Sequence, residues 1–216
     1  MVYRRTARSD AVRAASRNRL LEAARTLFAR QGYDETTMQQ IVAAADTSIG
    51  NAYFYFPNKE RLLVELVDTS ARKIWDDVEA DVAAIAPGPR RIGAIIYHNV
   101  SRVLEEDRDL AQLVFITEQR VASVAVMREI SIARWQPHLA ASYPGLTARQ
   151  VELAATAIFG ANRTVVERVL TGKTADADTR QLAREMVRWS LRALGTPDEE
   201  IALTVRSVSR SARAGA

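Results

Sequence analysis

Residues 32–60 read GYDETTMQQIVAAADTSIGNAYFYFPNKE, and this stretch decides the fold of the N-terminal part of the chain. Thr37 is followed three residues later by Gln40, which is the spacing of a capping box. We therefore expect a helix to begin at Thr37. The small apolar residues that follow suit tight packing against a neighbour, and the pattern breaks at Asp46-Thr47 after about nine residues.

Ser48 can cap a second short helix, from Ile49 to about Tyr55. Two short helices joined by so tight a turn have the geometry of a helix-turn-helix, here over residues 37–56. The second helix of that motif enters the major groove of DNA. The alternative is a pair of ordinary bundle helices with core aromatics. The caps, the glycine, the lysine and the basic residues nearby agree instead on the helix-turn-helix.

The second helix and its flanks carry groups that suit DNA. Gly50 lowers helix stability, so it indicates a place where another backbone approaches closely. Asn51 can pair with a base edge, above all that of adenine. Tyr53 and Tyr55 can donate their hydroxyls to phosphates. Lys59 lies near the start of the next helix, where an anion is favoured.

The first 30 residues carry a concentrated positive charge. Eight arginines stand there against two acidic residues, although the net charge of the whole chain is only +4. Clusters of this kind attract polyanions and indicate phosphate contacts, and a solvated basic tail is the alternative. We assign residues 1–13 to a basic N-terminal arm.

Apolar residues recur with helical spacing nearly everywhere, and no segment alternates cleanly with period two. The chain is predicted to be all-α, with a small N-terminal three-helix domain and a larger C-terminal helical bundle. Pro87-Gly88-Pro89 ends a long helix, and Pro137 is expected to kink or split a later one. The expected helices cover residues 12–31, 37–45, 49–55, 58–85, 90–106, 109–118, 121–141, 147–171, 177–194 and 198–208.

The N-terminal third resembles the DNA-binding module of the tetracycline-repressor (TetR) family. The features that match are Leu20-Leu21-Glu22-Ala23-Ala24, Leu27-Phe28, Gly32-Tyr33, Thr36-Thr37-Met38, Ile41, Ala45, Ser48, Gly50, Tyr53, Tyr55-Phe56 and Lys59-Glu60. One departure is in the turn, where Asp46 and Thr47 replace the family's glycine and small apolar residue. Aspartate tolerates the left-handed region better than most residues, so we expect the turn to survive.

The resemblance implies two domains and a set of DNA contacts. Residues 14–74 would bind DNA, and residues 75–216 would bind a small molecule and dimerise. The phosphate contacts would come from Thr37, Tyr53, Tyr55 and Lys59. The residues facing bases would be Gln39, Ile49, Gly50 and Asn51, and Ser48 completes the expected DNA-binding set.

The segments near 147–171 and 177–194 are apolar or small on two sides, so each needs two partners. We expect them to form an isologous homodimer interface, with a larger monomeric bundle as the alternative. An effector site is apolar with a few placed polar groups. Each polar candidate has the alternative of being a satisfied core group. The candidates are Asn99, Phe115, Trp135, His138, Phe159 and Asn162.

These features favour a cytoplasmic DNA-binding regulator with two partners, double-stranded operator DNA and a small hydrophobic or aromatic effector that releases the repressor. The alternative is control by a protein partner, or constitutive DNA binding. We expect no enzyme, catalytic residue, cofactor or metal, because there is no cysteine and the two histidines lack a paired ligand spacing. No apolar run reaches the roughly 20 residues that span a bilayer, so no membrane is expected as a partner.

Overall fold

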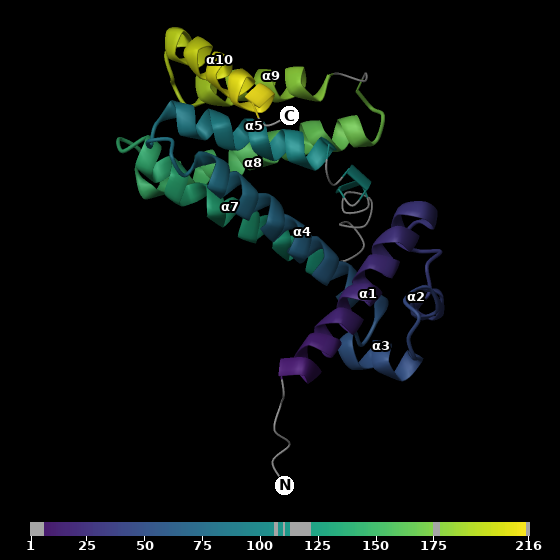
Figure 1. The fold of residues 1–216 in the computed structure, drawn as a ribbon. Coiled ribbons are helices and arrows are strands. Elements are labelled where there is room, and N and C mark those ends of the chain that lie inside the picture. Colours follow the sequence, from purple (N-terminus) through teal and green to yellow (C-terminus); the bar gives the residue numbers. More distant parts are fainter. Residues whose placement is uncertain (1–6, 106–107, 110, 113–121, 175–177, 215–216) are drawn as a thin grey trace.

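The computed structural model describes residues 7–105, 108–109, 111–112, 122–174 and 178–214. Throughout these ranges the regular structure is helical and contains no strand, so the all-α prediction is confirmed. Three helices gather at one end of the long helix α4, and the other helices lie along its far end (Figure 1). The two groups correspond to the predicted N-terminal and C-terminal domains.

The N-terminal domain consists of α1 (Ala7–Gln31), α2 (Met38–Ala44) and α3 (Ile49–Tyr55). Each helix contributes apolar side chains to one small core, which the first half of α4 completes. Burial of this shared apolar surface is the main force that holds helices as short as α2 and α3 in place. The most deeply buried side chains are Leu20, Ala24, Phe28, Ile41, Ala52, Phe56, Leu62 and Leu63.

Helix α4 (Lys59–Val82) belongs to both domains. Asn58 caps it, because its side-chain oxygen accepts a hydrogen bond of 2.8 Å from the Arg61 backbone N–H. Its buried side chains up to Val67 belong to the N-terminal core, and those from Ile74 onward belong to the C-terminal core. Residues 68–73 between them are exposed or half-buried. A single helix therefore connects the N-terminal domain to the bundle.

The C-terminal bundle is built around α5 (Pro89–Glu105). Its residues 92–97 are all buried, as expected for a helix with neighbours on every side. It contacts α4 and each of the other four helices of the bundle. Those four are α7 (Ala122–Ser142), α8 (Ala148–Leu170), α9 (Thr179–Ala193) and α10 (Asp198–Ala214).

Gly93 lets α5 lie close to α9 and α10. A methyl group added at this glycine would overlap the Thr204 side chain and would stand 3.2 Å from Val187 and 3.6 Å from Leu191. No side chain larger than hydrogen fits there without a shift of these neighbours.

Several helix boundaries differ from the sequence predictions. Helix α1 begins at Ala7, so the second half of the expected arm is already helical, because nothing in that stretch stops the helix. Helix α4 ends at Val82 and not at residue 85, whereas α10 continues to Ala214. Pro137 does not split α7, and it lies on the exposed side of that helix. The helix expected at 109–118 lies largely outside the described residues.

None of the helices in the described residues is long and apolar enough to cross a membrane. No group of three or more histidine, aspartate or glutamate side chains in this part of the chain is placed to hold a metal ion.

We expect Gly93→Ala to lower the free energy of unfolding by about 1–3 kcal/mol, which is typical when a methyl group is forced into a packed core. Urea denaturation of the full chain measures the change. Gly50→Ala is the matched control, because its added methyl meets no atom within 4 Å. Equal stability of the two variants would contradict the tight packing of α5.

Candidate nucleic-acid interface

Helices α2 and α3 are both capped at their N-termini by the side chains that the sequence predicted. The Thr37 hydroxyl accepts a hydrogen bond of 3.2 Å from the Gln40 backbone N–H, and the Gln40 side chain accepts one of 2.8 Å from the Thr37 N–H. These two bonds confirm the predicted capping box. The Ser48 hydroxyl accepts a bond of 3.2 Å from the Asn51 N–H and so caps α3 as predicted.

The turn between the two helices forms with Asp46 and Thr47 in it, as the sequence predicted. Asp46 has a φ of +47° and is the only residue other than glycine with a positive φ in the described chain. Aspartate adopts this left-handed conformation more easily than most residues. The turn is closed by hydrogen bonds of 3.3 Å from the Asp46 and Thr47 N–H groups to carbonyls of α2.

Helix α3 presents one face to solvent and buries the opposite one. Ala52 and the capping residue Phe56 are buried in the N-terminal core. The exposed face carries Ile49, Gly50 and Tyr53, which were predicted DNA contacts, together with Phe54, which was not predicted. Phe54 is 72% exposed, more than any other large hydrophobic side chain in the described chain. Its position four residues after Gly50 was the available signal, since residues four apart share a helix face.

The Asn51 side chain, whose base contact stays a prediction, has hydrogen-bond partners within the protein. Its amide nitrogen donates hydrogen bonds to the hydroxyls of Thr47, at 2.8 Å, and Ser16, at 3.0 Å. Ser16 is a buried residue of α1, so Asn51 ties α3 to α1. A side-chain amide has two N–H donors, and both are used inside the protein. The hydrogen bond between Asn51 and Ser16 joins residues 35 positions apart, and helical periodicity does not reveal such a contact.

Lys59, whose phosphate contact stays a prediction, is also bound within the protein. Its ammonium donates to the backbone carbonyls of Tyr33, at 2.6 Å, Thr36, at 2.7 Å, and Asp34, at 3.3 Å. It also stands 4.3 Å from the centre of the Tyr33 ring, within the range of a cation–π contact. An ammonium has three donors, so this set saturates it. Lys59 fastens the loop before α2 to the start of α4.

The remaining predicted DNA contacts lie together on the accessible side of the motif. Tyr55 is half-buried and meets Phe54 edge-on, with ring centres 5.1 Å apart. Arg17, one of the eight N-terminal arginines, is paired with Glu65 and lies over the Phe56 ring, so it braces α1 against α4. The exposed members of the predicted set are Thr37, Gln39, Ser48, Ile49, Gly50 and Tyr53.

Residues 20–66 match the family model described as bacterial regulatory proteins, tetR family. Over these residues the chain is similar to that family. The chain is 35% identical over 72 residues to the transcriptional repressor KstR of Mycolicibacterium smegmatis. It is 34% identical over 61 residues to the transcriptional regulator QacR of Staphylococcus aureus. These alignments cover 33% and 28% of this chain, and 34% and 32% of the relatives, so they span about a third of each relative's length.

The whole chain has the fold of TetR-like proteins of known structure. The fatty acid degradation regulator FadR of Bacillus halodurans matches 81% of this chain and 94% of its own, with a TM-score of 0.66 and 19% identity. The complex of RolR with resorcinol matches 91% of this chain and 95% of its own, with a TM-score of 0.66 and 23% identity. At these identities the likeness concerns the fold alone.

The predicted effector residues of the C-terminal bundle fall into different environments. Trp135 is a core residue that packs edge-on against Trp75, with ring centres 5.6 Å apart. Phe159 packs against the same core. Burial lowers the pKa of the half-buried His138, which favours its neutral form. Asn99 is half-buried, and Phe115 lies outside the described residues.

Asn162 is the member of the effector set with an unusual environment. It is 6% exposed, and its neighbours one turn away on α8, Ile158 and Val166, belong to the C-terminal core. Its side-chain oxygen is buried and accepts no hydrogen bond from any described residue. Buried polar atoms are nearly always paired, so this acceptor is an exception among the described residues.

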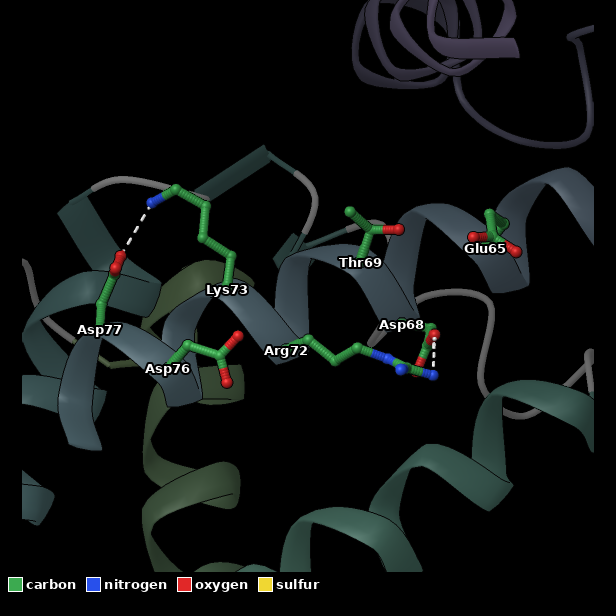
Figure 2. A pocket seen from close by; sticks show the side chains of 7 residues that line it. All are labelled: Glu65, Asp68, Thr69, Arg72, Lys73, Asp76 and Asp77. Carbon is green, nitrogen blue, oxygen red and sulfur yellow. Dashed lines mark hydrogen bonds and ion pairs between the residues drawn. The ribbon is translucent and has the colours of Figure 1, made fainter. Parts of the chain in front are cut away.

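Figure 2 shows a groove of about 580 Å³ on the surface of α4, in the segment between the two cores. Arg72 pairs with Asp68 at 2.7 Å and Lys73 pairs with Asp77 at 2.9 Å. Four carboxylates against two cations make a charged lining, which does not suit an apolar effector. None of the predicted effector residues is among the lining residues, which are Glu65, Asp68, Thr69, Arg72, Lys73, Asp76 and Asp77.

We expect Lys59→Ala to lower the free energy of unfolding by about 1–3 kcal/mol, because it leaves partly buried carbonyls without their charged donor. Thermal or urea unfolding of the full chain measures this loss. Lys73→Ala on the same helix is the control, since its ion pair with Asp77 is a surface pair and contributes little. The same small loss in both variants would argue against the fastening role of Lys59.

Proposed function

We propose that this chain is a transcriptional regulator that binds operator DNA as a homodimer and is released as a repressor by a small hydrophobic or aromatic effector. The observation that carries the proposal is the exposed face of α3, held by caps at the end of a TetR-type domain. A helix of this kind reads base edges in the major groove. Ser48 and Tyr53 are exposed residues whose hydroxyls are suited to the phosphates on either side.

The electrostatic requirement for DNA binding is met by α1. Arg13 and Arg19 are exposed on this helix, and the part of the chain that precedes it adds further arginines. Cations of this kind replace the counterions of the DNA phosphates, so the affinity falls as salt rises. Lys59 and Arg17 are engaged within the domain and support the binding surface from behind.

The test is a fluorescence-anisotropy titration of the full chain against duplexes from upstream of its own gene, with scrambled duplexes as the control, at several salt concentrations. We expect selective binding whose affinity falls steeply with salt, because several phosphates are contacted at once. We expect Gly50→Ala to weaken the selective binding about tenfold or more, by placing a methyl group between α3 and the DNA.

The stability of Gly50→Ala separates this effect from misfolding. The methyl meets open space in the free protein, and alanine favours a helix over glycine. The variant is therefore expected to be at least as stable as the parent chain. Salt-insensitive binding by a folded dimer, or unchanged affinity in Gly50→Ala, would argue against this use of α3.

The proposal of a small effector is supported by Asn162 in the bundle. Its unpaired buried oxygen would accept a hydrogen bond from a hydroxyl or N–H of a ligand otherwise surrounded by apolar side chains. The structural neighbour RolR was crystallised with resorcinol, an aromatic compound with two hydroxyls. A ligand seated there would shift α4 through the shared core and separate the two DNA-reading helices. Control by a protein partner instead predicts DNA binding that no small apolar compound reverses.

The proposed dimer uses the outer faces of α8 and α9. Leu153 on α8 is 59% exposed and Trp189 on α9 is 52% exposed, although both are large apolar side chains. Ala157 and Thr164 continue the face of Leu153 with small exposed side chains, which allows a second helix to approach closely. A two-fold pair would set the recognition helices about 34–36 Å apart, the spacing of successive major grooves.

We expect Trp189→Glu to convert the dimer to monomer in sedimentation velocity at micromolar concentration. Burying a charge in an apolar contact is strongly unfavourable. Leu203→Glu is the matched control, because Leu203 is 57% exposed but lies on α10, outside the proposed interface. Dissociation of both variants, or of neither, would contradict the assignment of the interface to α8 and α9.

A further inference from the structure

We propose that α3 reads thymine methyl groups, with Phe54 as the residue that contacts them. This inference rests on the proposed DNA binding and names the bases that the exposed face of α3 selects. Phe54 is not among the DNA contacts predicted from the sequence. Its side chain is 72% exposed on the face that would enter the groove.

The first argument is the chemistry that α3 has available. Arginine and lysine read guanine, asparagine and glutamine read adenine, and carboxylates read cytosine. Residues Ile49–Tyr55, all of which the structure describes, contain asparagine as their single member of this group. That residue is Asn51, whose two amide hydrogens are already donated to Ser16 and Thr47. Among these modes of base recognition, the side chains of Ile49 and Phe54 can make only the apolar contact with a thymine methyl.

The second argument is geometric. Ile49 and Tyr53 are four residues apart, as are Gly50 and Phe54, so the four form one continuous exposed arc. The position of a Cβ on Gly50 has no atom within 4 Å, which leaves space beside Phe54 for a base pair. Tyr55 is half-buried against the N-terminal core and contacts Phe54 edge-on. This contact orients the Phe54 ring away from the core.

The charge of this face favours DNA over an apolar protein surface as the partner that covers it. The exposed arc has no carboxylate that would repel phosphates; it includes the hydroxyl-bearing Tyr53, and the exposed residue Ser48 precedes it. Those hydroxyls would bind the phosphates that border the groove. Gln39 lies on α2, and base pairs that it contacts fall outside this proposal.

The experiment uses duplexes that the full chain selects from a random DNA library. Each thymine of a selected duplex is replaced in turn by uracil, which removes the C5 methyl group and leaves the base pairing intact. Affinity is measured by anisotropy for the parent chain, for Phe54→Ala and for Phe54→Leu. Phe54 makes few contacts within the protein, so both variants are expected to fold, and circular dichroism and sedimentation check this.

We expect uracil at one position in each half-site to weaken the parent chain about fourfold per methyl group, which is the effect of burying one such group. Phe54→Ala should bind more weakly and respond to that replacement by less than a factor of about 1.5, within the error expected for uncoupled sites. Phe54→Leu should keep most of the response, because it retains an apolar side chain.

Three outcomes would overturn the inference. If no uracil replacement weakens the parent chain, α3 does not read thymine methyls. The same loss in Phe54→Ala as in the parent chain would assign the methyl contact to another residue. If no duplex is selected and binding is insensitive to salt, the proposed DNA binding itself fails, and Phe54 would then belong to a contact with another protein.

Discussion

The arrangement of both domains depends on the burial of α4 in two separate cores. Its first half lies against α1, α2 and α3 through side chains such as Leu62 and Leu63, and its second half lies against the bundle through Trp75 and Val78. Apolar burial of this size is the dominant favourable term in folding, so neither end of α4 separates from its core without a large loss. A rotation or shift of the helix within the bundle is therefore transmitted to the N-terminal domain.

Charged contacts attach α4 to its neighbours along its solvent side. Arg102 of α5 pairs with Asp81, and the His98 imidazole stands 3.5 Å from the same carboxylate. Asp76 pairs with Arg134 of α7 at 3.7 Å. Exposed ion pairs contribute little stability, but they give the second half of α4 a defined position relative to α5 and α7. Burial lowers the pKa of His98 despite the nearby Asp81, which favours the neutral imidazole in this cluster.

In the N-terminal domain, some polar side chains form hydrogen bonds or ion pairs within the protein, and others are exposed to solvent. Asn51, Lys59 and Arg17 hold α3, the loop before α2 and α1 in position. Because these side chains are bonded within the protein, the exposed surface of α3 consists of aromatic and aliphatic groups with hydroxyls at its edges. In the proposed complex, such a surface would discriminate bases by shape and methyl contact, while the basic helix α1 would supply attraction that does not depend on sequence.

The sequence by itself determined the features that depend on near neighbours in the chain. The capping box at Thr37, the cap at Ser48 and the left-handed turn at Asp46 are set by contacts within four residues, so the helix-turn-helix was predictable. Only the tertiary structure decided the hydrogen-bond partners of Asn51 and Lys59. Asn51 contacts Ser16, which lies 35 residues away, and Lys59 contacts carbonyls 23 to 26 residues away. The choice between a base edge and an internal partner depends on which groups the packed fold brings within hydrogen-bond distance. Periodicity places a residue on a face of its helix but does not identify what lies opposite that face.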